Sequence, residues 1–290
     1  MLFILMILII IGSYLYKNYQ YKQGSYYNIT HNTLLSTILD AGRNGEYQIY
    51  KRLRHYESIG GKFLFNCYLP KENGETTEID VLLINSDGIF VFESKNYSGW
   101  IFGDEKSMNW TQTLPQGRGR SHKEQFFNPI IQNKVHLKWL RSIVGEALPL
   151  YSIIAFSDRC TLKKVNITSQ DVQVVNRYLI LSAVEHAGSV QARNLRQEEI
   201  NEIYNILYPF TQVSEEQRLE HIHNIQMNHS TPQFNHKSIS TGNESDQGKL
   251  IPQTCPKCGA LLVLRTAKKG THIGQQFYGC SNYPKCRYIR

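Results

Sequence analysis

Four cysteines near the C-terminus have the spacing of a metal site. Two residues separate Cys255 from Cys258, and Cys280 and Cys286 follow after a further 21 residues. Two close pairs of thiolates supply the tetrahedral, soft-ligand set that structural zinc prefers. The same four cysteines could instead form two disulfides or hold an iron–sulfur cluster. A reducing compartment disfavours disulfides, and the spacing, which is typical of a zinc ribbon, disfavours the iron–sulfur cluster. The spacing therefore predicts a structural Zn²⁺ site.

The residues around these cysteines combine positive charge with aromatic rings. Residues 251–290 contain seven lysines and arginines and no acidic residue, whereas the whole chain has 32 basic and 24 acidic side chains. Such a segment attracts polyanions, and aromatic rings beside cations stack on unpaired bases. A solvated basic surface is the simpler alternative. The residues expected to contact nucleic acid are Arg265, Lys268, Lys269, Phe277, Tyr278, Lys285 and Arg287.

Two stretches of this segment, CPKCGALLVLRTAKKG and FYGCSNYPKCRYIR, resemble the C-terminal zinc finger of bacterial type I DNA topoisomerases. In that family the finger binds DNA and does no chemistry itself. The resemblance covers residues 253–290, and nothing else in the chain is similar to a topoisomerase cleavage core. It therefore implies a DNA-binding finger and not a topoisomerase.

A second group of charged residues lies in apolar surroundings. The runs 78–85 and 88–93 predict two strands of a hairpin, in which Glu78-Ile79-Asp80 and Glu93-Ser94-Lys95 are the charged parts. Directly opposed residues have Cβ atoms about 5 Å apart, so two carboxylates there repel unless a cation lies between them. Hard oxygen ligands of this kind suit Mg²⁺.

The turn decides which of these side chains are opposite one another. If Ser86-Asp87 forms the two-residue loop, Asp80 lies opposite Glu93; if Asp87-Gly88 forms it, Asp80 lies opposite Lys95. Both registers place the three charged side chains on one face of the hairpin.

Two further polar side chains occupy positions where helical periodicity predicts apolar ones. Glu46 shares a stripe with Leu35, Leu39, Ile49, Tyr50 and Leu53, and Gln132 shares one with Val135, Trp139 and Ile143. Burying a carboxylate is costly without a cation or a hydrogen-bond partner, which the hairpin would supply for Glu46. The alternative is that each is a boundary residue that reaches solvent.

Four segments together resemble the nuclease-related domain (NERD) family: Gly42–Glu46, Glu78–Asp80, Gly88–Gly99 and Asn128–Gln132. The resemblance spans roughly residues 40 to 155. That family is similar to the PD-(D/E)xK nucleases, and the resemblance implies a restriction-endonuclease-like α/β fold with a mixed sheet flanked by helices.

The resemblance also implies roles for five residues. Asp80 and Glu93 would hold Mg²⁺, and Glu46 would complete the acidic shell. Lys95 would position or activate water, and Gln132 would assist. These catalytic roles amount to hydrolysis of phosphodiester bonds. The alternative is that Lys95 makes a buried ion pair with Asp80 or Glu93 in a non-catalytic domain.

The first sixteen residues, MLFILMILIIIGSYLY, contain no charged side chain. As a helix they would measure about 24 Å, slightly short of a ~30 Å hydrocarbon core, and flanking Lys17 and tyrosines can cover the difference. They lack the basic start and small-residue cleavage site of a secretory signal. Lys17 and Lys22 follow the span, which predicts a single-pass anchor in the cytoplasmic membrane with the remaining domains in the cytoplasm.

The composition excludes several classes of protein. Six cysteines in 290 residues are too few for a disulfide-built scaffold, and 41% hydrophobic residues are too many for a disordered chain. Further strands are expected at 62–69, 150–156 and 172–180, with helices at 34–58, 128–145 and 197–208. The expected parts are a transmembrane anchor at 1–16, a polar spacer at 17–33, a nuclease-like domain at 34–212, a flexible linker at 213–250 and a zinc finger at 251–290.

Together these features predict a membrane-anchored protein that binds single-stranded or duplex DNA. Its enzymatic part would be a Mg²⁺-dependent endonuclease, and its finger would bind DNA with zinc. The main alternative is a catalytically inactive DNA-binding adaptor at the membrane, and a third is a nuclease-fold protein that acts on RNA. No sequence feature indicates an oligomeric state.

Overall fold

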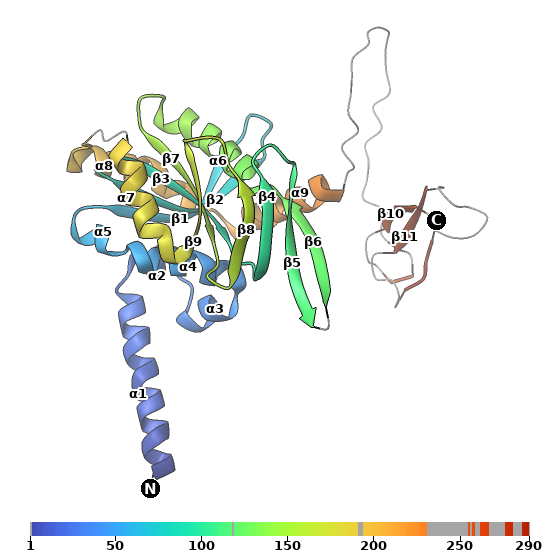
Figure 1. Ribbon diagram of the computed structural model, residues 1–290, viewed down its shortest axis with the longest axis horizontal. Coiled ribbons are helices and arrows are strands. Elements are labelled where there is room, and N and C mark those ends of the chain that lie inside the picture. The colour runs from blue at the N-terminus through green and yellow to red at the C-terminus, as the bar shows by residue number, and fades with distance from the viewer. Residues whose placement is uncertain are drawn as a thin grey trace. The chain divides into compact units, whose positions relative to one another are not determined.

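The computed structural model divides the chain into two compact units, Met1–Pro232 and Gln233–Arg290. Figure 1 shows the helices and strands of both. The residues that the structure describes are 2–117, 119–190, 194–230, 255, 257–258, 262–266, 276–280 and 286–289.

A five-stranded mixed sheet forms the centre of the first unit (Figure 1). Its spatial order is β1-β2-β3-β7-β9, with antiparallel pairing from β1 to β3 and parallel pairing from β3 to β9. Continuous apolar runs in β2, β3 and β7 are typical of strands that are buried on both faces. The strands are β1 (Lys62–Pro70), β2 (Thr76–Asn85), β3 (Gly88–Lys95), β7 (Leu150–Phe156) and β9 (Val172–Asn176).

The hairpin of β2 and β3 adopts the first of the two expected registers. Asn85 pairs with Gly88 and Val81 with Phe92, so Ser86-Asp87 is the loop. Gly88 has φ +146, a conformation that L side chains rarely adopt. Regular pairing ends at Val81 and Phe92, one position before the charged residues.

Helices cover both faces of this sheet. Helix α4 (Ala41–Leu53) begins with Asp40 as its N-cap, and α6 (Pro129–Val144) begins with an Asn128 cap followed by proline. Both helices pack on β2 and β3. The expected mixed α/β fold with flanking helices is therefore confirmed.

A second, four-stranded mixed sheet was not anticipated. Its order is β6-β5-β4-β8, and its core contains Trp110, Ile101 and Phe156. The strands β5 and β6 are mostly polar, and all but the last two residues of β6 are exposed, so no apolar alternation marks them in the sequence. The bounds are β4 (Gly99–Asp104), β5 (Asn109–Gly117), β6 (Arg120–Phe127) and β8 (Cys160–Asn166).

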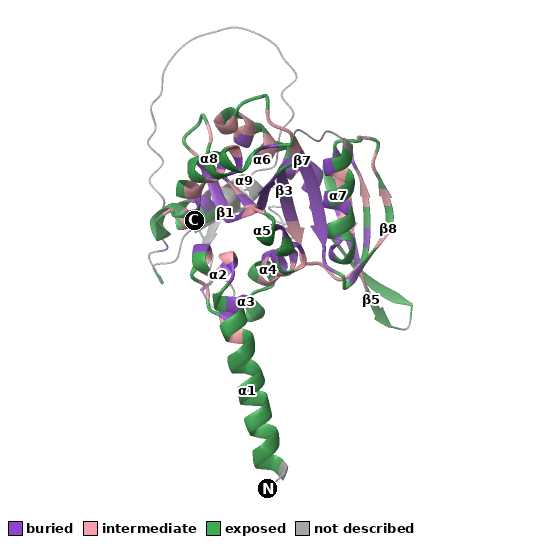
Figure 2. Ribbon diagram, turned by 90° about the vertical axis from the view of Figure 1, so that its left-hand side faces the viewer, coloured by how far each residue is buried: buried purple, intermediate pink, exposed green. Residues whose placement is uncertain are grey.

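The N-terminal region differs from the expected anchor and polar spacer. Helix α1 (Leu2–Lys22) extends six residues past residue 16, and its residues Phe3–Lys22 are long and apolar enough to cross a membrane. Figure 2 shows α1 exposed along most of its length. The short helices α2 (Ser25–Thr30) and α3 (Leu34–Leu39) follow. Tyr21 and Tyr26, which lie in the segment expected to be a spacer, are buried in an aromatic cluster with Tyr47 and Phe65 and so pack on the core.

The C-terminal part of the first unit also departs from expectation. Strand β9 ends at Asn176 and not at residue 180, and a 3₁₀ turn (Arg177–Leu179) and helix α7 (Ile180–Val190) follow it. Helix α5 (His55–Ser58) continues α4, and α8 (Gln197–Leu207) is close to its predicted bounds. A helix, α9 (Glu215–Ser230), occupies the first part of the segment expected to be a flexible linker, and residues 231–250 of that segment lie outside the described residues.

In the second unit, β10 (Leu262–Thr266) and β11 (Gln276–Cys280) form an antiparallel hairpin.

Candidate functional site

The four C-terminal cysteines converge on one point. Their sulfur atoms all lie within 4.8 Å of one another, with Sγ–Sγ distances of 3.7 Å between Cys255 and Cys286 and 3.3 Å between Cys258 and Cys280. Four ligands about 2.3 Å from zinc at tetrahedral angles are about 3.8 Å apart, so the cluster fits this ion. None of the six cysteines, all described, forms a disulfide. The predicted C4 zinc site is therefore supported.

The residues expected to contact nucleic acid are only partly described. Arg265 pairs in register with Phe277, and Tyr278 is the next residue of β11, but the positions of these side chains are not described. Arg287 is exposed. Lys268, Lys269 and Lys285 lie outside the described residues.

Glu93 and Lys95, at the end of β3, lie at the centre of a group of polar side chains in the first unit, which we call the acidic cluster. Lys95 Nζ is 2.7 Å from Glu93 Oε1 and donates a hydrogen bond of 3.0 Å to Gln132 Oε1 on α6. Glu93 is 2% exposed, and burial raises its pKa, but the charges of Lys95 and His136 outweigh burial and the pKa falls below its usual value. Burial lowers the pKa of Lys95, yet Glu93 and Asp80 raise it on balance, so both groups are charged.

His136 is a member of this cluster that the sequence analysis missed. Its Nε2 is 3.1 Å from Glu93 Oε2, and its Nδ1 is 2.7 Å from the hydroxyl of Thr77. The expected stripe of α6 was therefore misplaced, because the helix buries Asn133 and His136 and leaves Val135 exposed. The sequence spacing could have identified His136, because it lies four residues after Gln132 and therefore on the same face of the helix.

Asp80 lies where β2 and β3 separate. Its Oδ2 accepts a hydrogen bond of 2.7 Å from the backbone N–H of Ser94. Burial, with the neighbouring Glu93 and Glu46, raises the pKa of Asp80 well above its usual value. Burial and the neighbouring carboxylates therefore oppose the ionisation of Asp80 more than the nearby Lys95 favours it.

Glu46 approaches from the opposite side of the sheet to Gln132. A Cβ on Gly45 would lie 2.5 Å from Ser94 Oγ, so α4 packs against Ser94, whereas Glu93 and Lys95 face α6. Glu46 is buried and accepts a 3.1 Å hydrogen bond from the Tyr26 hydroxyl. Burial and the charge of Glu78 raise the pKa of Glu46 to about 8.

A fourth acidic residue, Glu78, links this cluster to α9. His221 of α9 is buried, with Nδ1 2.8 Å from the hydroxyl of Thr76 and Nε2 3.6 Å from Glu78 Oε2. Burial raises the pKa of Glu78 and lowers that of His221, so burial disfavours the charged form of both groups. The ring of His221 packs edge-on against Tyr68.

The acidic cluster offers oxygen ligands but does not form a closed cage. Among the described residues, only the four cysteines form a group of three or more ligands within 4.8 Å of one another. Hydrogen bonds or ion pairs engage both oxygens of Glu93 and one oxygen of Asp80. Glu46, Asp80, Glu93, Lys95 and Gln132 thus lie in one region, and the direct contacts join Glu93, Lys95 and Gln132.

Comparison with known proteins agrees with this arrangement. The family model described as nuclease-related domain matches residues 41–157, and the model described as topoisomerase DNA binding C4 zinc finger matches residues 252–290. An uncharacterized protein of Bacillus anthracis, pXO1-01, is 34% identical over 166 residues, which are 57% of this chain and 74% of the relative. No solved structure matches the chain significantly.

Two relatives match the C-terminal unit alone. DNA topoisomerase 1 of Methanocaldococcus jannaschii is 65% identical over 34 residues, which are 12% of this chain and 4% of the topoisomerase. The uncharacterized protein YrdD of Escherichia coli is 53% identical over 38 residues, 13% of this chain and 18% of YrdD. The chain therefore belongs to the nuclease-related domain family and ends in a C4 zinc finger of the topoisomerase type.

Proposed function

We propose that this chain is a membrane-anchored DNA-binding protein whose nuclease-related domain hydrolyses phosphodiester bonds with Mg²⁺. The observation that carries the proposal is the meeting of Asp80, Glu93 and Lys95 at the separated ends of β2 and β3, with Gln132 on Lys95. A carboxylate pair beside a lysine is the arrangement that metal-assisted phosphoryl transfer requires.

The donor set fits a hard divalent cation. Burial, and after it the charges of Glu93 and Glu46, hold the pKa of Asp80 well above its usual value, and a cation bound there would favour its ionised form. Asp80 and Glu93 would hold Mg²⁺, which when bound lowers the pKa of a coordinated water and neutralises charge on the phosphate.

The surrounding side chains position these groups. His136 holds Glu93 through Oε2, which fixes the carboxylate from the α6 side. Gln132 and Glu93 together orient the Lys95 ammonium, and a substrate phosphate offers this ammonium a second anionic partner. Lys95 then stabilises the negative charge that develops on the phosphate.

The remaining parts would bring DNA to this site at a membrane. Helix α1 has the length and composition of a single span, and Lys17 and Lys22 at its C-terminal end favour a cytoplasmic body. The zinc finger, like those of topoisomerases, would bind DNA without doing chemistry. Because the Tyr21 and Tyr26 contacts join α1 to the core, we place the anchor at the end of the domain with no spacer between them.

Cleavage assays on the detergent-solubilised full chain test this function. With Mg²⁺, plasmid and single-stranded DNA should be cut, and Asp80→Asn or Lys95→Ala should reduce the rate about 100-fold or more. Asp171→Asn and Lys106→Ala remove matched charges from exposed positions and should keep the full rate. Equal cleavage by all variants would contradict the proposal.

One observation favours a second candidate, a catalytically silent DNA-binding adaptor. Lys95 and His136 already occupy both oxygens of Glu93, which is how a purely structural ion pair would look. On this alternative no variant cleaves DNA, while the full chain still shifts DNA in a zinc-dependent way.

A further inference from the structure

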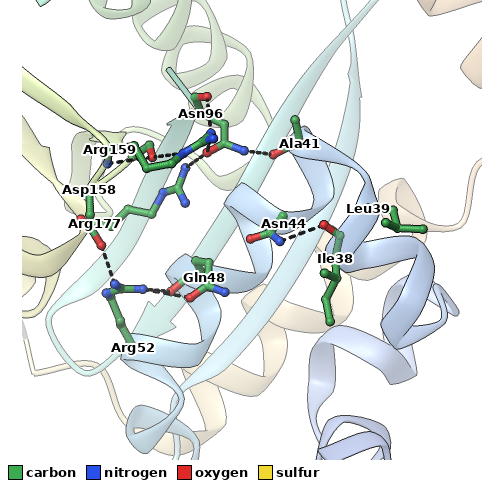
Figure 3. A pocket seen from close by; sticks show the side chains of 11 residues that line it. Ile38, Leu39, Ala41, Asn44, Gln48, Arg52, Asn96, Asp158, Arg159 and Arg177 are labelled. Carbon is green, nitrogen blue, oxygen red and sulfur yellow. Dashed lines mark hydrogen bonds and ion pairs between the residues drawn. The ribbon is translucent and has the colours of Figure 1, made fainter. Parts of the chain in front are cut away.

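A polar pocket of about 470 Å³ lies on the α4 side of the sheet, at the ends of β3 and β7 (Figure 3). It is formed by α3, α4, the ends of β3 and β7, and the 3₁₀ turn that follows β9. Its polar lining includes Arg52, Asn96, Asp158, Arg159 and Arg177.

The pocket contains three guanidinium groups and one carboxylate. Arg52 makes a 2.6 Å ion pair with Asp158. Arg159 and Arg177 both donate to the side-chain oxygen of Asn96, at 3.1 and 2.9 Å, and in the described part of the chain neither has a carboxylate within 4.0 Å. The pocket therefore carries uncompensated positive charge. Figure 3 shows Arg159 and Arg177 against Asn96, and Arg52 against Asp158 and Gln48.

Arg177 is the most informative of these residues. It is 4% exposed, and its buried Nε has no hydrogen-bond partner among the described residues. Burial lowers the pKa of Arg177, as expected for a cation removed from water. A buried charge without a counterion is destabilising, so proteins keep one mainly where an anionic ligand supplies the balance.

The pocket adjoins the cluster through the chain itself. Asn96 directly follows Lys95, and the backbone N–H of Ser157 donates a 2.8 Å hydrogen bond to the Lys95 carbonyl. The opposite wall is apolar, since Ile38 and Leu39 line it and are largely exposed. A cationic end and an apolar end match the phosphate and the sugar or base of one nucleotide.

We propose that Arg52, Arg159 and Arg177 form a binding site for a phosphate group of the nucleic-acid strand, next to the phosphate that lies at Asp80, Glu93 and Lys95. Only the placement of the neighbouring phosphate at Asp80, Glu93 and Lys95 rests on the proposed nuclease function. The pocket binds a strand phosphate whether or not the strand is cut. Arginine forks bind phosphate oxygens in pairs, which lysine cannot do.

Binding measurements test the site independently of turnover. The full chain in detergent, with Asp80→Asn to prevent cleavage, is titrated with a fluorescent single-stranded oligonucleotide at several salt concentrations. Adding Arg52→Gln and Arg159→Gln should weaken binding about tenfold or more and reduce the slope of log affinity against log salt by about one. Lys51→Gln removes a charge from the exposed neighbour of Arg52 and should change neither quantity. An unchanged affinity in the double variant overturns the site.

Two competition experiments test whether the bound phosphate belongs to a nucleic-acid strand. Inorganic phosphate and deoxyadenosine monophosphate should compete only weakly with the oligonucleotide. If either binds tightly in an arginine-dependent way while the oligonucleotide is insensitive to the arginines, the strand assignment is wrong. Arg177→Lys, checked for an unchanged melting temperature, keeps the charge but removes the fork and should also weaken oligonucleotide binding.

In the cleaving background, the double variant should raise KM about tenfold while kcat changes less than about threefold, since the site binds a phosphate that does not react. Loss of cleavage in Asp80→Asn, together with weaker oligonucleotide binding by the arginine double variant, supports both proposals. Arginine-dependent binding by a chain that never cleaves supports the pocket and contradicts the nuclease function alone.

Discussion

The zinc finger and the acidic cluster are encoded in different ways. All four sulfur ligands of the finger come from one short segment, and two residues separate Cys255 from Cys258. The acidic cluster combines side chains from β2, β3, α4 and α6, and its contacts include the pair Lys95–Gln132 and the pair Glu93–His136. The first site is therefore readable from spacing, and the second exists only once the sheet has formed.

This difference has a consequence for stability. Among the described residues of the second unit, the core consists of Cys255, Cys280 and Cys286 with Tyr288 packed beside them, so we expect the fold of this unit to depend on the ion. The acidic cluster lies on a sheet whose strands β2 and β3 are almost fully buried, so its fold does not depend on a metal. Three predictions test this contrast.

Zinc removal should have the largest effect and should be confined to the finger. A zinc-selective chelator, or Cys258→Ser, should abolish amide protection in β10 and β11, because structural zinc contributes roughly 10 kcal/mol or more to finger folding. Hydrogen exchange measured by mass spectrometry reports the amide protection of both units in one experiment. Cys67→Ala removes a buried thiol from β1 and should leave the zinc content unchanged. Protection of β10 and β11 without zinc would remove the contrast between the two sites.

Replacing His136 should have an intermediate effect that is felt in the first unit. His136→Ala removes the hydrogen-bond partner of Glu93 Oε2 and of the Thr77 hydroxyl. This loss should lower the free energy of unfolding by about 1–3 kcal/mol. Urea denaturation followed by tryptophan fluorescence measures this loss. His122→Ala, at an exposed position of β6, should change the free energy of unfolding by less than about 0.5 kcal/mol. Equal effects of the two variants would show that His136 does not support Glu93.

Sequence periodicity predicted the strands of the acidic cluster well. The apolar runs gave β1, β2, β3 and β7 nearly to the residue, and the turn residues narrowed the register to two choices. The choice between Glu93 and Lys95 as the partner of Asp80 required the structure, because both turns are chemically acceptable. Strands with exposed polar faces, such as β6, carry no such pattern and were missed.

Partners that come from distant parts of the chain were the hardest to predict. Tyr26, the hydrogen-bond donor to Glu46, lies in a stretch whose polar composition suggested a spacer. His221, which contacts Thr76, lies in a segment whose composition suggested a linker. In both cases a few buried aromatic or imidazole rings hold a polar segment on the core, and average composition does not show this.

The docking of α9 should give the smallest effect, a pH dependence of the first unit that is set by one histidine. Burial lowers the pKa of His221 below its usual 6.5, so the docked helix is most stable above that pH and loses stability as pH falls through the lowered pKa. The groups that face the ring are Tyr68, Lys71, Glu75, Glu78, Thr76 and His136.

Hydrogen exchange of residues 215–224, after correction for intrinsic exchange rates, should therefore speed up between pH 7.5 and pH 5 by up to about tenfold per pH unit. His221→Gln, which does not titrate, should remove this dependence, and His223→Ala at an exposed position of the same helix should retain it. The sign follows from burial of the neutral ring: a docked state that instead bound a proton through Glu78 would become more stable as the pH falls. Slower exchange of α9 at pH 5 would therefore contradict docking of the helix through a neutral His221 ring.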